Sequence, residues 1–163
     1  SCLVGSEMCI RDSHFTSKDE LYLAVLERTA EGTIANLKAA VKSHRKPVAR
    51  LRALLTELCQ ALYEDQDRGR LLLRSLIDED KERGKVLGEG VFGEGFRLFQ
   101  SEAAKIWPDL DSGEITLSLI ASCSYAYTLS DMRLHLPGIA KETPSPEDYA
   151  DHLIRVLKIG DAS

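Results

Sequence analysis

The sequence predicts an all-α fold, and three observations carry the prediction. Only 6% of the 163 residues are aromatic and five are Pro, whereas long stretches are rich in Ala, Leu, Glu, Lys and Arg, which favour helices. Apolar residues recur every three or four positions through most of the chain. Capping residues or Pro stand where these stretches begin. With 44% hydrophobic residues, the chain can form one domain with one core, and we expect about six helices.

The first thirteen residues do not follow this pattern. Residues 1–13 have neither helical nor strand periodicity, and they lack the basic start and long apolar core of a signal peptide. The segment from Cys2 to Asp12 resembles a translated sequencing-library adapter, because residues 8–12 can be read from a transposon end sequence. We therefore expect a tail that is not native to the fold. A native disordered N-terminal tail is the alternative.

A long helix is predicted from Lys18 to about Lys42. Ser17 can cap its first turn, and Glu20 stands three residues further on, as in a capping box. At 1.5 Å per residue the helix spans about 40 Å. Its apolar stripe repeats every four residues and comprises Leu21, Val25, Thr29, Thr33, Leu37 and Val41.

Three further helical segments follow before residue 108. One begins at Pro47 and runs to about 63, and a shorter one covers about 68–80 after the acidic break at 64–67. Residues 84–107 keep helical spacing in spite of four glycines. Each Gly costs about 1 kcal/mol relative to Ala in a helix interior, so we expect this helix to be weak at its start or bent.

Two last helices are predicted over 112–132 and 146–159, the second capped by Ser145. The helix over 112–132 carries apolar or small residues around much of its circumference. One core contact in a monomer of this size cannot bury all of them. We therefore expect a homodimer that forms through 112–132 and 146–159.

Charge and cysteine usage exclude several classes of function. The formal net charge of −5 argues against this chain clamping nucleic acid by itself. Apolar runs such as 71–73 are far shorter than the roughly 20 residues that cross a bilayer, so no membrane partner is expected. The four cysteines form no Cys-x-x-Cys pair and have no His at zinc spacing, so no metal is expected. Cys59 and Cys123 lie in apolar stretches, which fits buried thiols in a reducing cytoplasm.

Two patterns that mimic enzyme sites are better explained by structure. Residues 87–93 fit the glycine loop of protein kinases and a dinucleotide fingerprint. No His-Arg-Asp or Asp-Phe-Gly follows, and no strand precedes the loop. None of the four histidines pairs with Ser or Cys in a nucleophile motif, and Asp78, Glu79 and Asp80 fit a solvated helix end. We predict no catalytic residues and no cofactor, and hence no enzyme.

The segment His14-Phe15-Thr16-Ser17-Lys18-Asp19-Glu20-Leu21 closely resembles a junction in the TetR/AcrR family of transcriptional regulators. There the recognition helix ends and the long connecting helix begins, with the pattern aromatic or His, Phe, two residues, Lys, two acidic residues and Leu. The resemblance implies a TetR-like C-terminal helical domain. Residues 14–17 would be the remnant of a helix-turn-helix head, and 18–163 the effector-binding and dimerisation domain.

The resemblance also implies roles for individual residues. His14 and Lys18 would contact DNA phosphates, which a capped helix N-terminus suits, and operator DNA would bind only the full-length protein. The last two helices would form the four-helix bundle of a dimer, and a small apolar effector would act by population shift. Its candidate pocket residues are Cys59, Leu62, Tyr63, Leu73, Phe92, Phe96, Phe99, Cys123 and Tyr127. The alternative is a small helical ligand-binding protein or enzyme without a DNA role.

Overall fold

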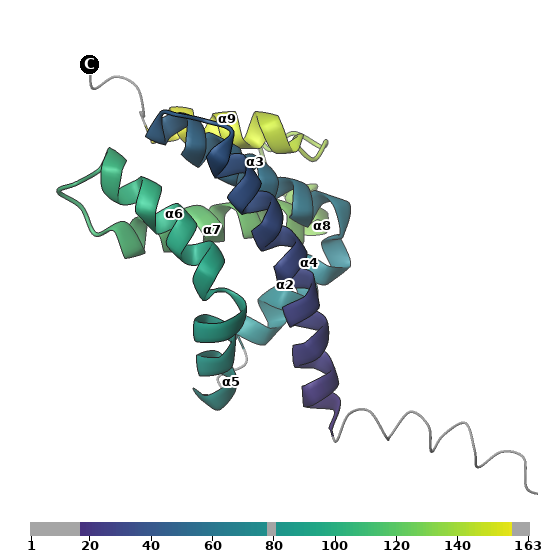
Figure 1. The fold of residues 1–163 in the computed structure, drawn as a ribbon. Coiled ribbons are helices and arrows are strands. Elements are labelled where there is room, and N and C mark those ends of the chain that lie inside the picture. Colours follow the sequence, from purple (N-terminus) through teal and green to yellow (C-terminus); the bar gives the residue numbers. More distant parts are fainter. Residues whose placement is uncertain (1–16, 78–80, 158–163) are drawn as a thin grey trace, which may run out of the picture.

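Helices make up most of the computed structural model, which describes residues 17–77 and 81–157 (Figure 1). No strand occurs in these two ranges, which confirms the predicted all-α class. The elements are α2 (Lys18–Lys42), α3 (Pro47–Glu64), α4 (Gln66–Ile77), α5 (Lys81–Lys85), the π-helical turn η1 (Val86–Val91), α6 (Gly93–Ile106), α7 (Ser112–Thr128), α8 (Ser130–Arg133) and α9 (Pro146–Val156). Residues 1–16, which include the adapter-like segment, lie outside the described part, as do 78–80 and 158–163.

The helix starts follow the local signals in the sequence. The Ser17 hydroxyl accepts a hydrogen bond from the Glu20 backbone N–H at 3.2 Å, so α2 begins at Lys18 as predicted. Ser145 caps α9 in the same way, with the Asp148 N–H at 3.1 Å. Pro47 occupies the first turn of α3, where its missing N–H leaves no partner unsatisfied.

The glycine-rich stretch from 84 to 107 is interrupted, as its composition predicts. The Phe92 N–H donates to the Leu87 carbonyl at 2.8 Å, which closes the π-helical turn η1 before α6 begins. A Cβ atom added at Gly93 would lie 2.8 Å from the backbone oxygen of Gly88. Since a side chain would not fit at that distance, Gly at position 93 allows the chain to pass from the π-helical turn η1 into the α-helix α6.

The long helix expected over 112–132 is two helices in the structure. Helix α7 ends at Thr128, Leu129 adopts φ −97° and ψ 27°, and α8 adds one short turn. That backbone conformation leaves the helical region, so the helix cannot continue through it. The described part of the last helix ends at Val156 rather than 159.

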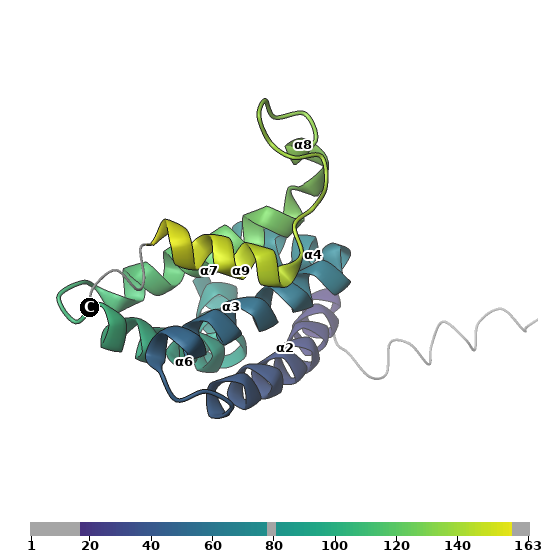
Figure 2. The same ribbon diagram turned by 90° about the horizontal axis from the view of Figure 1, so that it is seen from above.

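Helix α3 is the centre of the fold, because α2, α6, α7 and α9 all pack against it. Figure 2 shows α9 packed on α3, and α7 contacts α3 as well. The main core contains Leu37, Leu51, Leu54, Leu55, Cys59, Leu62, Phe99, Leu119, Cys123, Ala126, Tyr127, Ala150 and Leu153. A smaller cluster joins Leu26 in the N-terminal half of α2 to Leu87 and Val91 of η1. Within the described ranges, no helix combines the length and the apolarity needed to span a membrane.

Candidate functional site

Five of the nine predicted effector contacts lie together in the main core. Cys59, Leu62, Phe99, Cys123 and Tyr127 are between 0 and 6% exposed. The Tyr127 ring contacts the rings of Tyr63 and Tyr149 edge-on, at centroid distances of 6.1 and 5.9 Å. These five side chains therefore belong to one buried cluster of the core. Their role as effector contacts stays a prediction.

Three side chains in this part of the core, Cys123, Tyr127 and Tyr149, have raised pKa values and are therefore neutral at physiological pH. The neighbouring Cys59 thiol, together with burial, raises the pKa of Cys123 well above its ordinary value. Burial is also the main cause that raises the pKa of Tyr127, and it raises that of Tyr149. Because a thiol rather than a thiolate is present at Cys123, the core offers no activated sulfur nucleophile there.

Of the other four predicted contacts, Tyr63 lies at the edge of this group, where its ring contacts that of Tyr127, and the other three lie apart from it. Tyr63 is 46% exposed, and Phe92 packs against the smaller cluster between α2 and η1. Phe96 is half-buried on α6. Leu73 lines a groove between α4 and α7, so it is the one residue of the nine placed on a concave surface described below.

The predicted DNA contacts lie at the beginning of the described chain. Lys18 is the first residue of α2, directly after the capping Ser17. The structure does not describe its side chain, and His14 lies outside the described residues. Both phosphate contacts therefore stay predictions. The capped N-terminus on which they depend is present.

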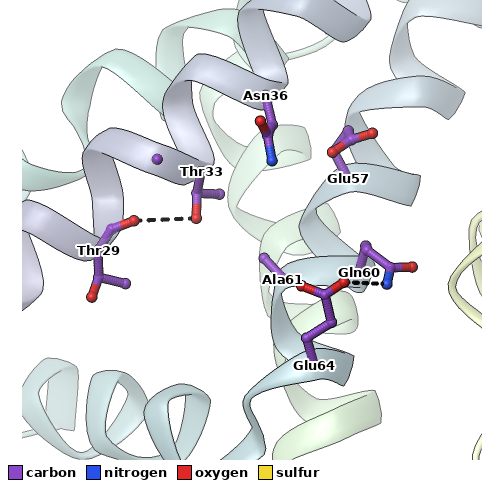
Figure 3. Close-up of a pocket in the computed structure, with 8 residues that line it drawn as sticks. Thr29, Thr33, Asn36, Glu57, Gln60, Ala61 and Glu64 are labelled. Carbon is purple, nitrogen blue, oxygen red and sulfur yellow. Dashed lines mark hydrogen bonds between the residues drawn. The ribbon is translucent and has the colours of Figure 1, made fainter.

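A small polar groove separates α2 from α3 (Figure 3). It has a volume of about 200 Å³, below the range of roughly 300–1,000 Å³ typical of small-molecule sites. Gln60 donates to Glu64 at 2.7 Å, and the Thr33 hydroxyl donates to the Thr29 carbonyl at 3.4 Å. Its two walls are stripes of helix positions i, i+3, i+4 and i+7, namely Thr29, Gly32, Thr33 and Asn36 on α2 and Glu57, Gln60, Ala61 and Glu64 on α3.

A larger groove, which we call the α4/α7 groove, runs between α4 and the C-terminal end of α7. Its volume is about 430 Å³, within the range for small-molecule sites. Leu73, Ile77 and Leu129 supply apolar walls, and the remaining lining residues are Arg70, Arg74 and Thr128. Its size and apolar walls make it the better candidate for a small apolar effector.

Helix α4 packs closely against α3 and α7 at Gly69, the residue before Arg70 of the α4/α7 groove. A Cβ atom at Gly69 would lie 3.1 Å from Leu62 Cδ2 and 3.3 Å from Thr128 Cγ2. The absence of a side chain at Gly69 therefore lets α4 approach both α3 and α7. Beyond Gly69, Arg70 crosses to α7 and α8, donating to the Thr128 carbonyl at 3.5 Å and pairing with Asp131 at 3.3 Å.

Among the residues predicted to contact an effector, Leu73 lines this groove. Arg70 and Arg74, which also line it, were not among those predicted from the sequence. Residues 70, 73, 74 and 77 follow helical spacing, so their shared face was readable from the sequence. Their opposite wall at Thr128 and Leu129 comes from a segment more than fifty residues later. No local pattern in the sequence predicts that α4 lies beside the end of α7.

A third feature is an exposed apolar surface on α7 and α9. Leu117 and Tyr125 of α7 are 57% and 50% exposed, and Val156 of α9 is 61% exposed. The Tyr149 hydroxyl donates to the Ser122 carbonyl at 3.2 Å, which links α9 to α7, and both helices pack against α3. We define the α7/α9 surface as the exposed Leu117, Tyr125 and Val156 together with the half-buried Ala121 and Tyr149.

The described residues contain no group of three or more His, Cys, Asp or Glu side chains placed to hold a metal ion. The buried carboxylate Glu102 contacts cations instead. It pairs with Lys105 at 2.6 Å and with Arg50 at 3.7 Å, while its second oxygen has no hydrogen-bond partner.

Comparisons with known proteins leave the chain without a match. No protein-family model matches it, and neither a curated protein nor a solved structure does.

Proposed function

We propose that this chain is the effector-binding and dimerisation part of a transcriptional regulator whose DNA-binding head precedes Ser17. The observation that carries the proposal is helix α2, which begins at Lys18 with Ser17 as its cap. This is the position at which the TetR-like segment of the sequence places the start of the long connecting helix. The proposal makes the protein a ligand-responsive repressor rather than an enzyme.

Helix α2 is suited to link a head to the helical body. Its C-terminal half packs into the main core through Leu37, whereas Leu26 in its N-terminal half contacts Leu87 and Val91 of η1. Figure 1 shows the N-terminal end of α2 at the opposite end of the molecule from α9. A change in how α2 packs on the body would therefore move anything that precedes Ser17.

Control by an effector then follows from a shift between two arrangements of the body. An effector that binds one arrangement more tightly raises its population, and it affects DNA binding only if the two arrangements place the heads differently. Paired heads reach successive major grooves about 34 Å apart in one arrangement and lose that spacing in the other. The α4/α7 groove is the proposed effector site.

Dimerisation through the α7/α9 surface would supply the second head. Leu117, Ala121 and Tyr125 repeat every four residues along α7, as a helix does when it packs against another helix. The same surface on a second copy can face it across a two-fold axis, which is the commonest symmetry of soluble dimers. The pair of α7 and α9 from each copy would then form a four-helix bundle.

DNA binding by a version with its native upstream sequence restored tests the proposal. We expect the restored protein to bind a palindromic operator as a dimer, and the present chain to bind duplex DNA weakly without sequence preference. Lys18→Ala in the restored protein should weaken binding to all sequences alike and lower the salt slope by about 1 for each phosphate that is no longer neutralised. Lys141→Ala, in the exposed loop before α9, is the matched control and should leave the slope unchanged.

Two results would overturn the proposal. One is an upstream sequence without a helix-turn-helix in the same reading frame. The other is a restored protein with no sequence preference at any salt concentration. Either result would favour a helical ligand-binding protein without a DNA role.

A further inference from the structure

We propose that the α4/α7 groove binds an elongated apolar molecule that carries one anionic head group, of the carboxylate class, and that Arg74 binds the head group. This inference names the ligand class of the proposed effector site, so its consequence for transcription rests on the proposed function. Binding of the ligand itself can be measured on the present chain.

The walls of the groove predict the apolar part of the ligand. Leu73 and Ile77 follow one another on the same face of α4, and Leu129 opposes them from the end of α7. Ile77 is 66% exposed, so a ligand chain lying against it would remove apolar surface from water. The stripe from Arg70 to Ile77 is about 10 Å long at 1.5 Å per residue, which favours an extended chain over a compact ring.

The two arginines of the groove differ in their partners, and the difference predicts the charge of the ligand. Arg70 pairs with Asp67 at 3.2 Å and with Asp131 at 3.3 Å, so two carboxylates already offset its charge. Arg74 is exposed and has no ion-pair partner among the described residues. Within the part of the chain that the structure describes, the Arg74 guanidinium is thus a cation without a carboxylate partner beside the apolar walls of the groove.

The guanidinium of Arg74 can bind the anionic head group of such a ligand, while the apolar walls contact its chain. Its planar donors match the two oxygens of a carboxylate, and the paired hydrogen bonds are charge-assisted. The polar groove between α2 and α3 has the opposite character, because Glu57 and Glu64 line it. An anionic apolar molecule is therefore expected at the α4/α7 groove and not at the polar groove.

The position of the groove gives the ligand a route to the dimer surface. Thr128 and Leu129 form one wall at the point where α7 ends. Tyr125, one turn earlier on α7, belongs to the α7/α9 surface. A ligand that draws α4 and the end of α7 together would therefore change the packing of a helix that the proposed dimer uses.

Calorimetric titration of the present chain with three probes of equal chain length tests the inference. The probes are decanoate, decanol and decylammonium, each below the concentration at which it forms micelles. We expect decanoate to bind at least tenfold more tightly than decanol, and decylammonium to bind more weakly than both. Arg74→Gln should reduce the affinity for decanoate at least tenfold and leave that for decanol unchanged. Arg28→Gln is the control, because Arg28 is an exposed arginine of α2 with no ion pair among the described residues.

A second variant tests whether the apolar chain of the probe binds in the α4/α7 groove. Leu73→Asn should weaken decanoate and decanol alike, while circular dichroism confirms that the helices remain. Equal binding of the three probes would overturn the inference, as would decanoate affinity that Arg74→Gln leaves intact.

The proposed ligand class and the proposed function can be refuted independently of each other. Decanoate binding that depends on Arg74 in a protein whose restored form ignores DNA would refute the proposed function only, whereas operator binding without decanoate binding would refute the ligand class only.

Discussion

Replacing Leu117 by Asn should weaken the proposed dimer, and the structure sets the size of the effect. Complete burial of a Leu side chain contributes about 1.5–3 kcal/mol. Since Leu117 is still 57% exposed in the single chain, roughly half of that gain is left for a partner to supply. A two-fold dimer buries the residue twice, so the effect is about 1.5–3 kcal/mol per dimer, which raises the dimer Kd by roughly 10- to 150-fold.

Sedimentation equilibrium over a range of concentrations would measure the change. Leu21→Asn provides the matched control, because Leu21 is 46% exposed on the N-terminal end of α2, far from α9 (Figure 1). It should leave the dimer Kd unchanged. A wild-type chain that stays monomeric at tens of micromolar would refute the reasoning, and so would a Leu117→Asn chain that dimerises as well as the wild type.

Two further predictions concern stability. Burial raises the pKa of Tyr127 above its ordinary value of 10.0, so the stability that its neutral form contributes is fully present below about pH 10 and is lost at higher pH, where the unfolded chain ionises first. Tyr127→Phe should therefore flatten the fall in urea midpoint between about pH 8 and about pH 11, and an unchanged slope would contradict this. Deleting residues 1–13 should leave the thermal midpoint unchanged, whereas a drop of several degrees would mean that the segment packs natively.

Helical patterns in the sequence predict which side chains meet in the core, but they do not predict whether those side chains line a cavity. Apolar side chains at helical spacing on several helices must meet in one core, which is why Cys59, Phe99, Cys123 and Tyr127 lie in one buried cluster. Whether such a group lines a cavity or fills it depends on how closely the helices pack. At Tyr127 the rings of Tyr63 and Tyr149 lie against it.

Local signals in the sequence predicted the all-α class and several of the helix starts. Ser17, Pro47 and Ser145 act on backbone groups within a few residues of themselves, so their effect is readable without the fold. The glycines of 84–107 predicted a weak or bent helix for the same reason, because each acts on its own backbone. The interruption at η1 agrees with that expectation.

The positions of the two grooves depend on how the helices pack, which became visible only in the tertiary structure. Beside the α4/α7 groove, Gly69 lets α4 approach Leu62 and Thr128, and Arg70 reaches Asp131, a residue 61 positions later in the chain. The end of α7 at Thr128 supplies the opposite wall. Helix spacing fixes which residues share a face, but contact between faces distant in sequence is set by the packing of the whole core, which no local pattern encodes.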